Sequence, residues 1–288
     1  MYLYATVAIY GGSIAVRTLC TAWFNLGTSK ATVSWLVDNA VNVRVKVPTT
    51  KGRWRAGQHV FIRFLSLRLY QTHPFSIASI EEDGDLVLII KQRTGLTGAL
   101  YDKVKAQKGS WETRVLIDGP YGGPSRDPGS FDTVLCVAGG VGITFTFPIM
   151  KDIVHRMQGL GKLRCSKLIF VWVVRSENTL DWLKEEISRG ASAAEDWVQV
   201  EYYITDKKLA SGEKDWIDSN ITVDYGRPNL GNVLSAAAEQ NHGRMCVLGA
   251  GPEGLMNTLC REVANLQKLA IKTAGSEEIF MHVETFGW

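Results

Sequence analysis

The sequence predicts a β plus α/β protein: an antiparallel β-barrel followed by an open parallel-sheet domain, with a short apolar helix at the N-terminus. Short runs rich in Val, Ile, Phe and Trp, separated by tight turns, begin at Ala31 and are typical of a barrel. After Pro128, strand-like apolar runs alternate with helical periodicity, which is typical of a parallel sheet covered by helices. The length of 288 residues suffices for two domains, each with its own core.

The composition narrows the class of protein. Apolar residues make up 45% and charged residues 21% of the chain, which is typical of a folded globular protein. The net charge of +3 is mild and no long basic run occurs, so we expect no nucleic-acid partner. The five cysteines are odd in number and form no CxxC motif. They predict buried free thiols in a reducing compartment, and we assign no metal site.

The N-terminal segment is apolar: residues 2–16 carry no charge, Arg17 follows, and residues 19–26 are again mostly apolar. A membrane span needs about 20 apolar residues, so the segment is borderline. It does not resemble a signal peptide, because no basic region precedes it and no clear cleavage site follows. Three hypotheses stay open: a weak membrane helix, the end of a helix whose partners are missing, or a helix packed on the soluble body. If it inserts, Arg17 and Lys30 place the rest of the chain in the cytosol.

The expected elements follow from hydrophobic periodicity and turn residues. In the first half, strands are expected at residues 32–36, 42–47, 59–64, 75–80, 86–92 and 114–118, with a short helix at 97–104. In the second half, strands are expected at residues 131–138, 167–174, 198–204, 244–249 and 279–283, and helices at 144–158, 180–188 and 254–269. Residues 207–231 are polar with little periodicity and are expected to form a surface excursion.

Two glycine-rich loops of the second half each follow a strand and precede a helix. The first contains Gly139, Gly140, Gly142 and Thr144, and the second covers residues 249–254. Glycines let the backbone turn tightly and approach a phosphate, and a helix N-terminus supplies free N–H donors. Two such loops at the carboxyl ends of parallel strands would line one crevice, where ligands of open α/β sheets bind. The alternative is a pair of structural turns.

The second strand of this half ends in Arg175, Ser176 and Glu177. An NAD site usually places an acid there for the ribose 2′-hydroxyl, whereas an arginine suits the 2′-phosphate of NADPH. Arg175 therefore favours NADPH, and Glu177 keeps the choice ambiguous. The alternative is a solvated charge at a strand end.

Two segments of the first half also suggest a ligand. In the run His73, Pro74, Phe75, Ser76, the proline fixes the backbone, the phenyl ring suits a flat ligand ring, and the serine suits a ring nitrogen. Phe75 alone would more commonly be a core residue. The second segment runs from Lys91 to Gly98.

In that second segment, Lys91 and Arg93 precede Gly95 and Thr97 at a glycine-rich helix start. Cations beside a helix N-terminus suit a pyrophosphate. The alternative is a solvated strand edge.

Together these segments resemble one family, the ferredoxin–NADP⁺ reductase superfamily, and within it the fungal ferric-chelate reductase and NADPH oxidase branch. The resemblance runs from about residue 30 to Trp288. The motifs that carry it, in order, are HPFSIAS, KQRTGLTG, GPYG, GGVGIT and ETFGW. Residues 2–12, YLYATVAIYGG, are similar to the last transmembrane helix of fungal ferric reductases. The resemblance implies an apolar helix at 1–28 that is the remnant of such a helix, an FAD-binding barrel at 29–127 and an NADPH-binding domain at 128–288.

The resemblance also implies roles for single residues. His73 would contact the FAD phosphates or ribityl chain, Phe75 its ring, and Ser76 the N5 region. The terminal aromatic of the family covers the flavin, which makes Phe286 and Trp288 candidates beside Ser76 for the catalytic centre. The remaining implied cofactor-binding residues are Pro74, Lys91, Arg93, Gly95 and Thr97 for FAD, and Gly139, Gly140, Gly142, Thr144, Arg175, Ser176, Gly251 and Pro252 for NADPH.

The chain departs from the family pattern in two places. A cysteine often precedes Gly-Pro in the last loop, and here that position is Ala250, with Cys246 on the preceding strand. This departure bears on the efficiency of hydride transfer. The family's membrane bundle holds two haems with paired histidines, but none of the five histidines lies in the N-terminal segment. We therefore expect this chain to bind no haem by itself.

The resemblance implies hydride transfer from nicotinamide C4 to flavin N5 and then release of single electrons. The acceptor would be a ferric chelate, a quinone, a dye or oxygen reached directly, or a haem on a membrane partner. The location would be a membrane, with both nucleotide-binding domains on its cytosolic side, or the cytoplasm if the helix does not insert. The alternatives are a truncated, catalytically silent or regulatory module of a ferric reductase, and an electron donor like that of superoxide-forming NADPH oxidases.

Overall fold

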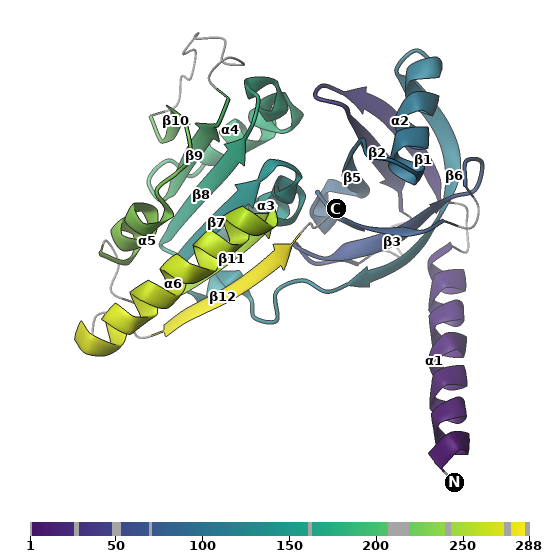
Figure 1. Ribbon diagram of the computed structural model, residues 1–288, viewed down its shortest axis with the longest axis horizontal. Coiled ribbons are helices and arrows are strands. Elements are labelled where there is room, and N and C mark those ends of the chain that lie inside the picture. Colours follow the sequence, from purple (N-terminus) through teal and green to yellow (C-terminus); the bar gives the residue numbers. More distant parts are fainter. Residues whose placement is uncertain are drawn as a thin grey trace. The chain divides into compact units, whose positions relative to one another are not determined.

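The computed structural model describes residues 2–25, 29–47, 53–68, 71–160, 163–206, 219–239, 243–273 and 278–285. The chain divides into two compact units, Met1–Gly123 and Pro124–Trp288. Figure 1 shows the strands and helices of each unit, which are described separately below.

The first unit is built on an antiparallel sheet of six strands in the order β4-β3-β6-β1-β2-β5. Helix α2 (Leu96–Ala106) follows β5. The strands are β1 (Lys30–Leu36), β2 (Ala40–Lys46), β3 (His59–Phe64), β4 (His73–Ser76), β5 (Asp85–Lys91) and β6 (Ser110–Tyr121). The predicted antiparallel architecture is therefore confirmed.

Hydrogen bonds beyond the end of β4 join the two edges of this sheet. The amide of Ala78 donates to the carbonyl of Val87 on β5 at 2.7 Å, and the amide of Val87 donates to Ser79 Oγ at 3.0 Å. The buried indole of Trp54 donates to the carbonyl of Ser79 at 2.9 Å. These bonds close the sheet into a barrel and leave fewer unpaired edge groups.

Alternate side chains of the barrel strands point inward, as the pleat of a β-strand requires. The resulting core is dominated by aliphatic residues and is completed by one face of α2. Its fully buried members include Val33, Val43, Ile62, Phe64, Leu86, Leu88, Ile117 and, from α2, Leu100 and Val104. This core supports β4 and the start of α2, the two segments for which the sequence predicted ligand binding.

Strand β4 differs from its predicted range of 75–80. It begins at His73, ends at Ser76 and lies at the end of the strand order, paired only with β3 among the described strands. Pro74 has no N–H to donate, so an edge position suits it. Strand β6 is longer than the predicted 114–118, because it pairs with β1 through one half and with β3 through the other.

The second unit contains a parallel sheet of six strands in the order β10-β9-β8-β7-β11-β12. The strands are β7 (Thr133–Gly139), β8 (Lys167–Val174), β9 (Val198–Ile204), β10 (Ile221–Tyr225), β11 (Arg244–Gly251) and β12 (Glu278–Thr285). Successive strands run outward from β7 to β10 on one side, and β11 then returns to the other side of β7. The strand order therefore reverses between β7 and β11, the place where open α/β sheets bind ligands.

Helices cover both faces of this sheet (Figure 1). They are α3 (Ile143–Leu160), α4 (Lys184–Ser192), α5 (Leu230–Glu239) and α6 (Glu253–Thr273). On one face, Leu230 and Leu234 of α5 and Leu259 of α6 pack against Leu135 and Val171. The predicted α/β domain is confirmed.

Two elements of this unit were missed from the sequence. Strand β10 and the start of α5 lie in the segment 207–231 that was expected to be a surface excursion, of which residues 207–218 lie outside the described part. Strand β10 is an edge strand in which only Ile221 is buried, so it lacks the apolar run of a central strand. Helix α4 begins at Lys184 rather than at the predicted residue 180. The residues before it form a separate 3₁₀ helix, η4 (Glu177–Trp182).

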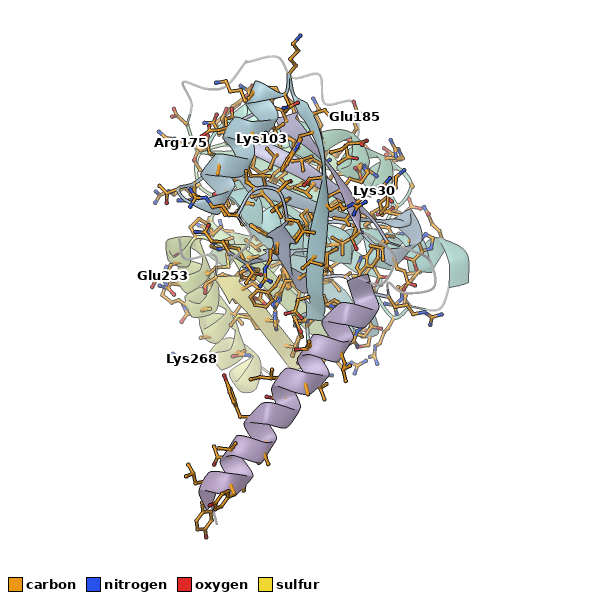
Figure 2. The ribbon with its side chains drawn as sticks, turned by 90° about the vertical axis from the view of Figure 1, so that its right-hand side faces the viewer. Lys30, Lys103, Arg175, Glu185, Glu253 and Lys268 are labelled. Carbon is orange, nitrogen blue, oxygen red and sulfur yellow. The ribbon has the colours of Figure 1, made fainter. Side chains whose placement is uncertain are left out.

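Helix α1 (Tyr2–Asn25) precedes the barrel. Large apolar side chains along it, among them Tyr4, Ile9, Tyr10 and Leu19, are exposed, and Figure 2 shows side chains standing out from this helix. Among the helices of the described residues, none combines the length and apolar character that crossing a membrane requires.

Asp127 ties the start of the second unit to α3. Its carboxylate accepts hydrogen bonds from the amide of Gly129 at 3.1 Å and from Arg156 Nη2 of α3 at 2.8 Å. The hydrogen bond from Arg156 lowers the pKa of Asp127, partly offset by desolvation. The pair is partly exposed, with 48% of the Asp127 side chain accessible, so its contribution to stability is discounted for screening by solvent.

We expect Asp127→Asn to lower the free energy of unfolding by about 0.5–1 kcal/mol at neutral pH. The folded pKa of Asp127 is depressed, so its contribution is present above the unfolded pKa of about 3.9 and is lost as the pH falls through the folded pKa. The difference between variant and parent in urea denaturation should therefore shrink in strong acid. Asp181→Asn, at an exposed carboxylate of the same unit, is the control. A difference that stays constant down to pH 2 would contradict the account.

Candidate nucleotide-binding sites

The two glycine-rich loops lie in direct backbone contact at the carboxyl ends of β7 and β11. A Cβ atom on Gly142 would lie 2.0 Å from the carbonyl oxygen of Ala250, and one on Gly139 would lie 2.6 Å from Cδ of Pro252. A Cβ atom on Gly251, whose φ is +154°, would lie 2.9 Å from the Cα of Gly139. Only residues without a side chain permit this approach. The structure therefore joins the loops of the two predicted motifs into one surface.

Gly140 presents the open part of this surface. Its φ of +52° favours glycine, and no heavy atom lies within 4 Å of the position that a Cβ would take. From inside the fold, Trp172 of β8 donates its indole N–H to the carbonyl oxygen of Gly140 at 3.0 Å, and its side chain is fully buried. Trp172 thus holds the loop from within while the backbone stays accessible from outside.

Trp172 was not identified as a site residue from the sequence. Its only signal is chemical: a buried indole N–H in a central strand needs an acceptor. Which acceptor it finds depends on the pairing of β7 with β8, in which Ala138 lies opposite Trp172.

The chain continues from the first loop into η3 (Gly140–Gly142) and then α3. Backbone N–H groups in the first turn of a helix have no partner within it, and together with the helix dipole they favour an anion. Thr144 was predicted to contact the nucleotide. Its side chain is buried and its hydroxyl donates to the carbonyl of Val141 at 3.0 Å, which stabilises the turn. The groups that this turn offers a phosphate are therefore backbone amides.

Arg175 lies at the end of β8, where the sequence predicted a 2′-phosphate contact. Its side chain is 83% exposed, and its Nε lies 3.7 Å from Oδ2 of Asp206, just beyond the end of β9. Figure 2 shows Arg175 at the surface of its unit. Ser176 is half-buried and precedes η4, whose Thr179 amide donates to the Ser176 carbonyl at 3.1 Å. A guanidinium on this open edge can receive a phosphate group.

In the barrel unit, β4 carries the predicted flavin segment. His73 and Pro74 are exposed, whereas Phe75 and Ser76 are half-buried. Phe75 packs partly against the barrel core, so one part of the ring is structural and the rest faces away from the core. The centroids of the His73 and Phe75 rings lie 6.5 Å apart, which places both on one side of the strand.

The predicted pyrophosphate segment folds into a tight turn at the start of α2. The hydroxyl of Thr97 accepts a hydrogen bond from the amide of Arg93 at 2.9 Å. A Cβ on Gly98 would lie 2.6 Å from the carbonyl oxygen of Arg93, so this position requires glycine. Gly95 has a φ of +72° and open space beside it, and the Arg93 side chain is exposed. The turn leaves a cation and open backbone at the helix start.

Lys91 has an additional role that was not predicted. Its ammonium group lies 3.0 Å from a carboxylate oxygen of Asp38, in the turn between β1 and β2. The amide of Gln92 donates to the carbonyl of Asn39 in the same turn at 2.7 Å. Lys91 therefore fastens the end of β5 to that turn.

Three cysteines of the second unit, Cys136, Cys165 and Cys246, are buried, whereas Cys260 is half-buried. Burial raises the pKa of Cys246 to about 12, and it raises the pKa of Cys136 as well.

Ala250, the position of the departure from the family pattern, is itself fully buried and pairs with Glu284 of β12. Phe286 and Trp288 lie outside the described residues. Within the described ranges, no group of three or more His, Cys, Asp or Glu side chains could hold a metal ion.

Two known families match this chain, one over each unit. A family described as an FAD-binding domain matches residues 25–125, and one described as a ferric reductase NAD-binding domain matches residues 131–264. The chain therefore carries an FAD-binding domain followed by a ferric reductase NAD-binding domain. The first match covers most of the barrel unit, and the second covers most of the parallel-sheet unit.

Curated relatives of this ferric reductase-type chain are fungal. The probable cell surface ferric reductase kap2 of Aspergillus oryzae is 34% identical over 203 residues, covering 65% of this chain and 26% of the relative. Ferric/cupric reductase transmembrane component 7 of Saccharomyces cerevisiae is 26% identical over 342 residues, covering 100% of this chain and 53% of the relative. The chain spans about half or less of the length of these relatives.

Solved structures show the same fold at low sequence identity. A ferredoxin NADP⁺ reductase from Neisseria gonorrhoeae with bound FAD and NADP has a TM-score of 0.60 and 14% identity, covering 89% of this chain and 98% of that one. The FAD/NAD-binding domain of a nitric oxide dioxygenase from Vibrio cholerae has a TM-score of 0.58 and 15% identity, with the same coverage.

We expect Gly142→Ala to weaken binding of NADP⁺ at least about tenfold, because separating the two loops costs about 1–3 kcal/mol. Isothermal titration of the FAD-loaded protein measures this affinity, and circular dichroism checks the fold. Gly159→Ala, which adds the same methyl group to open space near the end of α3, is the matched control and should bind as the parent does. Unchanged affinity in a folded Gly142→Ala variant would contradict the assignment.

Proposed function

We propose that this chain takes a hydride from NADPH onto FAD and delivers single electrons to a ferric chelate or a similar small acceptor. The observation that carries the proposal is the glycine-only contact of two loops at the point where the strand order reverses. In the same chain, the barrel unit presents a second open, glycine-dependent turn beside a cation. A pair of such sites suits the two dinucleotides of the reaction.

The residues of the second unit fit a nicotinamide dinucleotide. Gly139, Gly140 and Gly142 would let the pyrophosphate approach the backbone amides, with Gly251 and Pro252 completing the floor. Arg175 and Ser176 would receive the 2′-phosphate that distinguishes NADPH. The exposure of Arg175 supports this role, because a phosphate can reach its guanidinium without moving the strand. Thr144 would act indirectly, by shaping the turn.

The residues of the barrel unit fit FAD. His73 would contact the phosphates or ribityl chain, Phe75 the ring, and Ser76 the region of N5, with Pro74 holding the strand. Arg93, Gly95 and Thr97 would form the pyrophosphate turn, and Lys91 would add charge while bound to Asp38. FAD, when bound, accepts a hydride and gives up electrons one at a time. We retain the prediction that Phe286 or Trp288 covers the flavin.

The acceptor and the location are inferred from the relatives. Relatives carry the printed names ferric reductase or ferric/cupric reductase, and several are transmembrane components. We propose that this chain works on the cytosolic side of a membrane, beside a haem-bearing partner where electrons must cross. The exposed apolar side chains of α1 support contact with such surroundings.

Flavin spectroscopy tests the proposal directly. We expect the purified protein to bind FAD at micromolar concentration and the flavin absorbance to bleach faster with NADPH than with NADH in anaerobic stopped-flow mixing. Re-oxidation by a ferric chelate should follow. Folded protein that fails to bind FAD at this concentration would overturn the enzymatic proposal, whereas a preference for NADH would overturn the role of Arg175 alone.

A further inference from the structure

The ends of β8 and β9 are joined beyond the last pair of the sheet. The amide of Thr205 donates to the carbonyl of Val174 at 2.9 Å, and its hydroxyl donates to the same oxygen at 3.1 Å. One residue further, the amide of Asp206 donates to the carbonyl of Arg175 at 3.1 Å. The backbone therefore fixes Asp206 directly beside Arg175.

The side chains of Asp206 and Arg175 differ in solvent exposure. The Asp206 side chain is 29% exposed, whereas that of Arg175 is 83% exposed. Their ion pair joins Oδ2 of Asp206 to Nε of Arg175 at 3.7 Å. A carboxylate thus lies at a fixed place, next to a guanidinium that solvent and ligands can reach.

We propose that Asp206 is a specificity-determining residue of the nucleotide site, and that it narrows the preference for NADPH over NADH. This inference rests on the proposed function of Arg175. A carboxylate close to the guanidinium offsets part of its attraction for the 2′-phosphate and repels that dianion directly. The same carboxylate can accept a hydrogen bond from the ribose 2′-hydroxyl of NADH, the contact that acids make at NAD sites. Glu177 was the acid considered for this role from the sequence, but the fixed acid beside Arg175 is Asp206.

Binding of two small probes isolates the effect. 2′,5′-ADP and 5′-AMP differ only in the 2′-phosphate, so the ratio of their affinities measures the preference without electron transfer. In Asp206→Asn we expect the affinity for 2′,5′-ADP to rise about three- to tenfold and that for 5′-AMP to stay level or fall. The gain should shrink with added salt, because salt screens exposed charges. Titration calorimetry on the full FAD-loaded chain gives both affinities.

Asp196→Asn is the matched control. Asp196 lies two residues before β9, as Asp206 lies two residues after it, and it is exposed. The control removes the same charge at the opposite end of the strand and should leave the ratio of the two affinities unchanged. Asp206→Ser replaces Asp206→Asn if the latter does not fold.

Arg175→Gln separates failure of this inference from failure of the proposed function. The inference stands if Arg175→Gln loses the preference for 2′,5′-ADP over 5′-AMP and Asp206→Asn increases this preference above that of the parent. If Arg175→Gln loses the preference while Asp206→Asn weakens it or leaves it unchanged, Asp206 only positions Arg175 or has no effect on specificity. The inference about Asp206 is then wrong, and the phosphate site at Arg175 stands. An equal gain in Asp196→Asn also overturns the inference. An unchanged preference in Arg175→Gln overturns the phosphate site and the inference together.

Discussion

The close approach of two backbones, Gly142 to the carbonyl of Ala250 and Gly139 to Gly251, is the constraint on which the nucleotide site depends. Parallel pairing of β7 with β11 brings the loops to one edge of the sheet, and side-chain-free positions let them touch. Gly140 lies in the first of these loops with open space beside it, and Trp172 of the neighbouring β8 holds its carbonyl oxygen from inside the fold. Close packing of the two loops thus brings their backbones together at one edge of the sheet.

The barrel unit contains a similar close contact between a glycine and neighbouring backbone. Gly98 lies against the carbonyl of Arg93, and this contact folds the turn so that Gly95 stays open beside an exposed cation. Just before this turn, the ion pair of Lys91 with Asp38 joins the end of β5 to the turn between β1 and β2. In both units, glycine is required by contact with neighbouring backbone, and a second glycine close by, Gly140 or Gly95, has open space beside it. Flavin and nicotinamide chemistry is then supplied by the cofactors, while the chain supplies position.

The sequence predicted the strongly periodic elements and both glycine motifs, because these depend on local pattern. It missed β10, whose single buried residue, Ile221, gives no strong hydrophobic period. It also missed Trp172, Asp38 and Asp206, whose roles arise from contacts between segments distant in the chain. It predicted a nucleotide contact for Thr144, but the residue lies in the first turn of α3 and its hydroxyl donates to the carbonyl of Val141, a bond that depends on the turn geometry.

Hydrogen–deuterium exchange with and without NADP⁺ tests the central claim most directly. If the paired loops form one nucleotide-binding surface, peptides covering residues 139–146 and 249–255 should gain protection together, with the same dependence on NADP⁺ concentration. Backbone amides in direct contact with a pyrophosphate exchange more slowly, so the effect reports the contact itself. Protection of only one loop, or of neither while NADP⁺ binds elsewhere on the chain, would contradict the account.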